Sequence, residues 1–272
     1  MTPQAADMVC RLVHARSGVR LDPARIYMIE VRLTPIARRQ GLETLDELIE
    51  ALPGDEPLAW AATEALTQAE TCFFRDRVPF HRFRDELLPG LAGRRERPLR
   101  VWSAGCATGQ EAYSLAMMID EAASAAPGLK VQLFASDLSE RRLEKARSGL
   151  YSQFEVQRGL PIRLLLRHFD KADDLWQAAP RLRERIRWRQ VNLMDPLKPV
   201  GHFDVVFCRN LIGMLDPDLR PAVLEKLART MTPDGWLVLG AEESALGVTD
   251  ALRPVEGWPG AFARSPDFRA AA

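Results

Sequence analysis

A glycine turn is the strongest chemical signal in this 272-residue chain. In the segment VWSAGCATGQEAYSLAM, residues 101–117, a predicted buried strand runs through Gly105-Cys-Ala-Thr-Gly109 into a predicted helix. Glycines at such a turn let the backbone approach a ligand closely. The spacing is not the G-x-G-x-x-G of dinucleotide folds, and no G-x-x-x-x-G-K-[ST] occurs, which argues against NAD and nucleoside triphosphates. A tight turn needed only for packing would leave the same pattern.

An acidic residue at the end of the next predicted strand adds a nucleoside-binding interpretation. Asp137 follows VQLFAS, where a carboxylate accepts hydrogen bonds from ribose hydroxyls in folds of this kind. The alternative is an N-cap for the helix predicted from Ser139. The turn and the acid in this order favour a nucleoside ligand more than either feature alone.

Polar residues also follow the third and fourth predicted strands. Asn192 could bond an adenine edge while Leu193 covers the face of the base, or it could be an ordinary loop residue. Asn210 and Leu211 follow the fourth strand and therefore lie at the same rim. We interpret the neighbouring Cys208 as a small buried residue rather than a nucleophile.

A further candidate segment, ETCFFRD, ends the helical region of the chain. Thr71 and Arg75 lie four residues apart and would share a face if this segment is helical. Arg75 could reach a substrate carboxylate; the alternative is a surface ion pair with Asp76 or Glu70. The four histidines show no metal-ligand spacing, so we predict no metal site.

The elements that must position these residues change in character near residue 90. Residues 1–95 have apolar positions at helical spacing, which predicts a small bundle whose second helix is broken or kinked at Pro35. We expect strands at 99–104, 130–135, 186–191, 203–208 and 236–240, and helices at 111–123, 139–147 and 217–231. This alternation predicts a parallel, doubly wound α/β sheet with a ligand crevice at the carboxyl ends of its strands. The expected domains are 1–90, with a linker to about 97, and 98–272.

Composition excludes several classes of protein. Lys+Arg and Asp+Glu both number 37, so no net charge attracts nucleic acid or an anionic membrane. No apolar run reaches the roughly 18 residues needed to span a bilayer. The start lacks a secretory signal, and the four cysteines form no CxxC pair. We expect a cytoplasmic monomer that binds no nucleic acid and does not insert into the membrane.

The sheet, the glycine turn and the rim acid together suggest a methyltransferase that uses S-adenosylmethionine. The lack of a metal site or an evident general base fits transfer to a carboxylate. A free glutamate has a pKa of about 4.3 and is already ionised at neutral pH. Positioning and exclusion of solvent would then determine the rate.

These motifs resemble, in order and over nearly the whole chain, the CheR family of chemotaxis-receptor methyltransferases. The matching segments are ETCFFRD, SAGCATGQEAYSLAM, ASDLSERRLEKARSGLY, VNLMD, FDVVFCRNL and MTPDGWLVLGAEES. The resemblance implies methylation of glutamates on the cytoplasmic helices of transmembrane chemoreceptors, with S-adenosylhomocysteine as the product. It also implies cofactor contacts by Thr71, Arg75, Gly105, Glu111, Asp137, Asn192, Leu193, Asn210 and Leu211, with Arg75 beside the sulfonium and the incoming glutamate.

Four positions depart from the family pattern. Ala69 replaces an asparagine, and Gln110 and Ala112 replace a glutamate and a proline of the glycine turn. Met214 replaces a tyrosine that lies near the active site in the family. Ala69 and Met214 motivate an alternative function, a CheR-like cofactor-binding regulatory module with weak or no turnover. A third hypothesis is a small-molecule methyltransferase. The receptor-like helical domain argues against it.

Two expectations concern the protein partner. Arg32, Arg38 and Arg39 would face an acidic receptor helix bundle, although a solvated basic face would look the same. The resemblance also implies a small β-subdomain at residues 152–187, which some members use to bind a receptor pentapeptide by strand addition. Here the segment after Phe169 looks short and acidic, so we expect no such tether; an aromatic pocket formed by Trp176 is the alternative.

Overall fold

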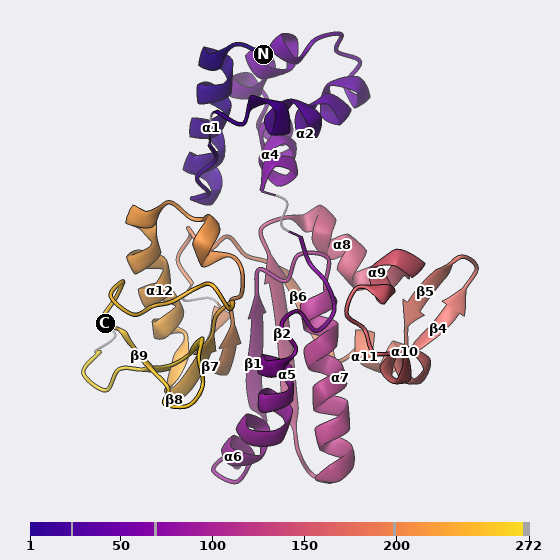
Figure 1. Cartoon of the computed structure of the whole chain (residues 1–272), viewed down its shortest axis with the longest axis vertical. Coiled ribbons are helices and arrows are strands. Elements are labelled where there is room, and N and C mark those ends of the chain that lie inside the picture. Colours follow the sequence, from indigo (N-terminus) through magenta and orange to yellow (C-terminus); the bar gives the residue numbers. More distant parts are fainter. Residues whose placement is uncertain (23, 68–69, 198–199, 269–272) are drawn as a thin grey trace.

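Four helices form a bundle at the amino-terminal end of the molecule (Figure 1). The computed structural model describes residues 1–22, 24–67, 70–197 and 200–268. The bundle contains α1 (Pro3–Ser17), α2 (Ile26–Arg39), α3 (Leu45–Ala51), the short 3-10 turn η1 (Leu52–Gly54) and α4 (Glu56–Leu66). The side chains of Thr2, Thr44 and Asp55 cap α1, α3 and α4, which fixes where these helices begin.

Helix α2 continues through Pro35 to Arg39, so the expected break at this proline is wrong. Pro35 lies on the exposed face of the helix. Its ring removes a hydrogen bond to the carbonyl of Val31, a residue that is 49% exposed, so water can replace the lost donor. The buried side of the helix keeps its packing.

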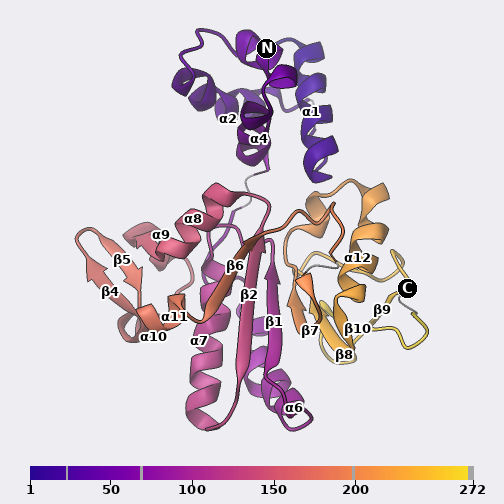
Figure 2. The ribbon, with the colours of Figure 1, turned by 180° about the vertical axis from the view of Figure 1, so that it is seen from behind.

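A seven-stranded sheet confirms the predicted doubly wound α/β architecture. Its strand order is β6 (Ile186–Gln190), β2 (Val131–Asp137), β1 (Leu99–Ala104), β7 (Phe203–Phe207), β8 (Met231–Val238), β10 (Ala261–Arg264) and β9 (Leu252–Pro254). β1 pairs in parallel with β2 and with β7, and β6 extends the parallel part beyond β2 (Figure 2). The antiparallel strands β10 and β9, which we did not predict, complete the far edge.

Helices cover both faces of this sheet. One face carries α7 (Gln110–Ala125), α5 (Val78–Arg82), the π-helical segment η2 (Phe83–Leu87) and α6 (Leu88–Ala92). The other face carries α12 (Arg220–Arg229), preceded by the 3-10 turns η4 (Ile212–Met214) and η5 (Pro217–Leu219). Helix α8 (Glu140–Ser148) follows β2 and contacts both β2 and β6.

Residues 73–91 pack with the sheet and not with the amino-terminal bundle. The ring of Phe207 lies 6.0 Å from Phe80 and 5.4 Å from Phe83, and all three are buried in one apolar cluster. The expected linker is also anchored, because Arg97 makes hydrogen bonds to the buried Asp204 of β7. Helical spacing alone could not show which core these helices join. We therefore propose a domain boundary close to residue 67, where α4 ends, instead of near residue 90.

A small antiparallel sheet follows α8, in the region where the resemblance implied a β-subdomain. Its order is β3 (Leu150–Ser152), β5 (Leu175–Ala178) and β4 (Phe169–Ala172), with α9 (Gln153–Gln157), α10 (Ile162–His168) and α11 (Pro180–Arg183) around it. Edge-to-face aromatic contacts join it to the rest of the molecule: Tyr151 and Phe169 lie 5.1 and 5.7 Å from Phe73. Across the described ranges, no helix combines the length and apolarity that crossing a membrane would require.

Candidate active site

The two glycines of the turn after β1 are required for different reasons. Both have positive φ, +76° at Gly105 and +96° at Gly109. A Cβ atom at Gly109 would lie 2.8 Å from the Cβ of Ala146 and 3.0 Å from the hydroxyl of Tyr151, so this glycine serves packing. A Cβ at Gly105 would approach the side chain of Leu211 at 3.3 Å, at the wall of a cavity. Packing therefore accounts for Gly109, whereas Gly105 both packs against Leu211 and lines the cavities.

Asp137 lies at the carboxyl end of β2 with its side chain only 5% exposed. Its carboxylate accepts hydrogen bonds from the backbone N–H groups of Ala107 and Ser139, both at 2.9 Å, and from Arg142 Nη1 at 3.3 Å. The residue that caps α8 is Ser139, whose hydroxyl accepts from the backbone N–H of Arg142 at 3.2 Å. The N-cap alternative for Asp137 is therefore wrong.

The predicted cofactor residues line two narrow adjoining cavities of about 50 Å³ each. Both cavities are lined by Gly105, Asp137 and Leu211. The first adds Thr71, Arg75, Glu111 and Asn210, and the second adds Asn192 and Leu193. Every cofactor residue expected from the sequence thus borders the same region at the carboxyl ends of the strands.

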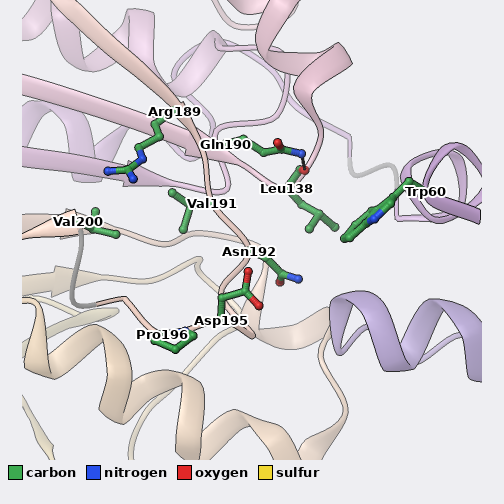
Figure 3. Close-up of a pocket in the computed structure, with 9 residues that line it drawn as sticks. All are labelled: Trp60, Leu138, Arg189, Gln190, Val191, Asn192, Asp195, Pro196 and Val200. Carbon is green, nitrogen blue, oxygen red and sulfur yellow. Dashed lines mark hydrogen bonds between the residues drawn. The ribbon is translucent and has the colours of Figure 1, made fainter. Parts of the chain in front are cut away.

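A wider cleft of about 380 Å³ opens beside the second cavity, between α4 and the segment after β6 (Figure 3). It shares Leu138, Val191 and Asn192 with that cavity and has the indole of Trp60 at its border. The amide of Asn192 is already engaged: it donates to the carbonyl of Arg16 at 2.7 Å and accepts from the N–H of Met194 at 3.0 Å. Asn192 therefore joins the sheet domain to the end of α1.

Glu111 is the second acidic residue of the site. Its side chain is 13% exposed and accepts a hydrogen bond from the hydroxyl of Ser103 at 2.8 Å. Burial raises the pKa of Glu111, although the nearby Arg209 guanidinium, at 3.4 Å, acts in the opposite direction. A carboxylate in this position can accept from a ligand ammonium group only while it is ionised.

Arg209, which the sequence reasoning did not single out, connects three parts of the site. Its side chain is 1% exposed and donates to the carboxylate of Asp76 at 2.6 Å and to the carbonyl of Arg75 at 2.9 Å. It also contacts Glu111 and lies over the ring of Phe80. An arginine that follows the mostly apolar segment VVFC, residues 205–208, was the available signal, because a buried charge needs partners.

Backbone strain concentrates around these cavities. Among the described residues, six non-glycine residues have positive φ. Five of them lie in residues 74–77, in the turn after β1 and in the loop after β7: Phe74, Asp76, Arg77, Ala107 and Asn210. Such conformations cost of order 1–3 kcal/mol each and cluster at ligand-binding sites. The strained backbone therefore indicates a functional site, which the sequence patterns could not show.

Glu243 stabilises one of these strained loops. Its carboxylate accepts hydrogen bonds from the backbone N–H groups of Asn210 at 2.7 Å, Gly213 at 2.9 Å and Gly240 at 2.8 Å. Three N–H donors on one carboxylate fix the loop after β7 relative to the end of β8. Glu243 is therefore a second residue that positions the site and was missed from the sequence.

Arg75 reaches the first cavity from a turn and not from a helix. Residues 73–76 form turns, so the expectation that Thr71 and Arg75 share a helical face is wrong. The guanidinium of Arg75 donates to the backbone carbonyl of Glu70 at 2.9 Å. The carboxylate of Glu70 pairs with Arg158 at 3.3 Å, so the surface ion pair between Arg75 and Glu70 is not formed.

The family departures lie at or near the site, with one exception. Ala69 lies outside the described residues. Gln110 is 2% exposed at the start of α7, where its side-chain oxygen accepts from Thr108. Met214 lines the second cavity. In the described part of the chain, no group of three or more His, Cys, Asp or Glu residues could hold a metal ion.

The hydrogen-bond acceptors of this region fit S-adenosylmethionine. A largely buried carboxylate after β2, Asp137, suits ribose hydroxyls, and the largely buried Glu111 suits the ammonium group of the amino-acid moiety. Gly105 lines both cavities beside these acids. The fold and this site together define an S-adenosylmethionine-dependent methyltransferase.

Two family models match the chain. "CheR methyltransferase, all-alpha domain" matches residues 5–67, and "CheR methyltransferase, SAM binding domain" matches residues 69–259. The chain therefore belongs to the CheR methyltransferase family, as the motifs indicated.

Curated relatives cover most of the chain. Chemotaxis protein methyltransferase 1 of Vibrio cholerae is 36% identical over 256 residues, which are 92% of this chain and 93% of that protein. Chemotaxis protein methyltransferase 1 of Pseudomonas aeruginosa is 36% identical over 257 residues, 91% of this chain and 93% of that protein. The probable biofilm formation methyltransferase WspC of Pseudomonas aeruginosa is 34% identical over 92% of this chain and 59% of that protein.

Proposed function

We propose that this protein transfers methyl groups from S-adenosylmethionine to glutamate side chains on the cytoplasmic helices of chemoreceptors. The names of the relatives support a role in chemotaxis signalling. The observation that carries the proposal is the joint placement of Asp137, Glu111 and Arg75 around one cavity, two acids for a cofactor and one cation for a carboxylate.

Each side chain has a separate task in this proposal. Asp137 accepts a hydrogen bond from a ribose hydroxyl, and Glu111 accepts from the ammonium group. Arg75 orients the incoming glutamate carboxylate, because a guanidinium matches its planar geometry. The cofactor supplies a methyl group already activated on a sulfonium. No base is needed, since the substrate carboxylate is ionised at neutral pH.

The exposed face of α2 is the proposed receptor-docking surface. Tyr27, Met28 and Val31 are 72%, 44% and 49% exposed, and Arg38 and Arg39 are exposed on the same side of the helix. Apolar side chains bordered by arginines fit an acidic helical bundle. They also favour a protein substrate over a small molecule.

Arg32 has a role within the fold that limits its part in docking. Arg32 is half-buried, and its guanidinium donates to the carbonyl of Leu66 at 2.8 Å. We therefore place Arg38 and Arg39 at the centre of the docking proposal.

A transfer assay tests this function directly. The protein is incubated with tritiated S-adenosylmethionine and receptor-containing membranes, and base-labile label is counted on the receptor. We expect label with the wild type and a large loss with Asp137→Ala. Measurable cofactor binding without any receptor label would contradict the proposal.

A regulatory module without turnover is the second candidate, because Met214 lines the cavity where the family has a tyrosine. Met214 supplies no hydroxyl to the site. The same assay separates the two functions, and Met214→Tyr sharpens it. If turnover is weak and this variant raises it by tenfold or more, the module is favoured.

A further inference from the structure

Arg142 stands at a position that helix stability does not explain. It is the third residue of α8, whose N-cap is Ser139. The amino-terminal end of a helix carries a partial positive charge, so a cation in the first turn is unfavourable there. Arg142 is nevertheless only 14% exposed, so other contacts must hold its guanidinium in place.

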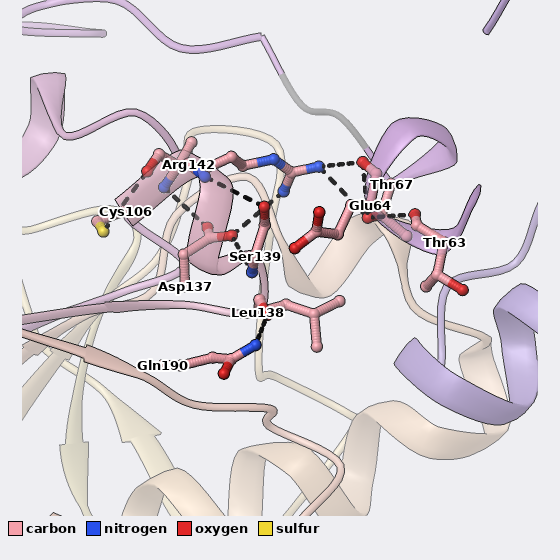
Figure 4. A network of polar contacts seen from close by, with 10 residues as sticks. Thr63, Glu64, Thr67, Cys106, Asp137, Leu138, Ser139, Arg142 and Gln190 are labelled. Atoms are coloured by element: carbon pink, nitrogen blue, oxygen red, sulfur yellow. Dashed lines mark hydrogen bonds and ion pairs between the residues drawn. The ribbon is translucent and has the colours of Figure 1, made fainter. Parts of the chain in front are cut away.

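Those contacts join two parts of the molecule (Figure 4). Nη1 of Arg142 donates to Oδ1 of Asp137 at 3.3 Å, on the sheet side. Nη2 donates to the carbonyl of Glu64 at 2.7 Å and to the hydroxyl of Thr67 at 3.3 Å, at the end of α4 in the helical bundle. One guanidinium therefore contacts both the proposed ribose acceptor and the helix that borders the cavity.

The end of α4 is a suitable acceptor for a cation. The last carbonyls of a helix carry partial negative charge and lack partners within the helix. Thr67 is 5% exposed, and its hydroxyl donates to the carbonyl of Thr63 at 2.8 Å, which leaves its lone pairs available to Arg142. Both Thr67 and Arg142 line the two cavities.

We propose that Arg142 is a positioning residue that couples cofactor occupancy to the placement of the α4 end over the cavity. The inference rests on the proposed role of Asp137 as the ribose acceptor. An ionised carboxylate offers about four acceptor positions, and Asp137 uses three. A ribose hydroxyl completes this shell while Arg142 remains, so the cofactor, Asp137, Arg142 and Thr67 form one connected network. Order imposed at Asp137 by the ligand then reaches α4.

The coupling through Arg142 can be tested separately from the attachment of the helical bundle, because a second contact also attaches the bundle. Asn192 donates to the carbonyl of Arg16 independently of Arg142, so the bundle stays attached when Arg142 is changed. Arg141, the neighbouring residue on the exposed side of α8, offers a matched control with the same charge in the same helical turn.

Hydrogen exchange with and without saturating S-adenosylhomocysteine, on the full-length chain, tests the proposal. Wild type and Arg141→Met should show slower exchange both at the glycine turn and at the end of α4. Arg142→Met should bind the product about tenfold more weakly, as expected for a contact-coupled pair. At saturation it should keep the slowing at the turn and lose it at α4. Thr67→Val removes the longer of the two contacts of Arg142 at α4 and leaves the one to the Glu64 carbonyl, so it should weaken the α4 response, with a smaller loss of affinity than Arg142→Met.

The outcomes separate this inference from the proposed function. No slowing at the glycine turn in the wild type would contradict the cofactor site itself. Slowing at the turn with an unchanged or faster α4 in the wild type would contradict only the coupling. An α4 response of wild-type size in both Arg142→Met and Thr67→Val would also overturn it. If Arg142→Met does not fold, the Thr67→Val result decides.

Discussion

Two buried aspartates on the central sheet have similar partners and different tasks. Asp204, near the start of β7, is fully buried and accepts hydrogen bonds from Arg97 at 2.7 and 2.8 Å, from the N–H of Arg100 at 2.9 Å and from Arg95 at 3.2 Å. Asp137, at the end of β2, also contacts one arginine and two backbone N–H groups. Only Asp137 borders a cavity at the carboxyl ends of the strands.

The difference shows that the edge of the sheet decides what a buried acid does. At the start of the strands, the acceptors of Asp204 are filled by Arg95 and Arg97, whose segment is thereby fixed to the sheet, and by the N–H of Arg100 in β1. At the end of the strands, glycine turns and strained loops leave room for a ligand beside Asp137. The same residue type thus stabilises the fold at one edge and offers an open acceptor at the other.

The largest expected effect is on stability, from Asp204→Ala. Burial raises the pKa of Asp204, but hydrogen bonds from Arg97, Arg100 and Arg95 outweigh this effect and hold the pKa below its ordinary value of 3.8. Removing one partner of such a pair costs about 3–5 kcal/mol. Urea unfolding at pH 7 should show a loss of this size.

Acid dependence provides the control for this variant. A lowered pKa in the folded state means that the stabilisation is present above pH 3.8 and is lost as pH falls further. The gap between wild type and Asp204→Ala should therefore narrow in acid. If wild type and Asp204→Ala had equal free energies of unfolding at pH 7, Asp204 would not stabilise the fold.

The next effect concerns the pH dependence of cofactor binding through Glu111. Because burial raises its pKa above 4.5, acidification should protonate Glu111 before a free glutamate. Affinity for S-adenosylhomocysteine should then fall by up to about tenfold per pH unit below that pKa. Calorimetry between pH 5 and pH 8 measures this profile.

Two variants identify the group responsible. Glu111→Gln should bind more weakly but with little dependence on pH in this range. Arg209→Met removes the cation that lowers the pKa of Glu111, so the fall in affinity should move to higher pH. If the pH profile of affinity were the same in Arg209→Met as in wild type, Arg209 would not influence the pKa of Glu111.

A smaller effect is expected on docking, far from both aspartates. Reversing Arg38 and Arg39 to Glu should lower receptor methylation by about three- to tenfold at low salt, because exposed ion pairs contribute little individually. The effect should shrink as ionic strength rises. Cofactor affinity should stay constant, and Arg253→Glu, an exposed charge reversal on β9, serves as the control. An unaltered methylation rate would favour the solvated basic face.

The last prediction is that the β-subdomain does not bind a receptor pentapeptide. Asp170, Asp173 and Asp174 lie on or beside the β4–β5 hairpin, where they would repel an acidic receptor pentapeptide. The indole of Trp176 donates to Gln153 at 2.8 Å, and Lys171 lies over its ring. A peptide titration should show no saturable binding. Micromolar binding that is lost in Trp176→Ala would mean that the hairpin does tether.

Much of the fold and of the cavity could be predicted from the sequence, because both depend on local patterns. Alternating apolar runs predicted the parallel strands, and residues after strand ends predicted Asp137 and Asn210. The roles of Arg209, Arg142 and Glu243 could not be predicted, since their partners are distant in sequence and only the folded chain brings them together. For the same reason, helical spacing could not assign residues 78–92 to the amino-terminal core or to the core under the sheet.

Calorimetry of S-adenosylhomocysteine with wild type, Asp137→Ala and Asp204→Ala, at a temperature where all three are folded, tests the difference between the two edges most directly. Loss of a hydrogen bond to a charged group costs about 1.5–3 kcal/mol, so Asp137→Ala should bind about 10- to 100-fold more weakly. Asp204→Ala should bind like the wild type despite its lower stability. Unchanged affinity in Asp137→Ala, or an equal loss in both variants, would contradict the assignment of the carboxyl edge as the cofactor site.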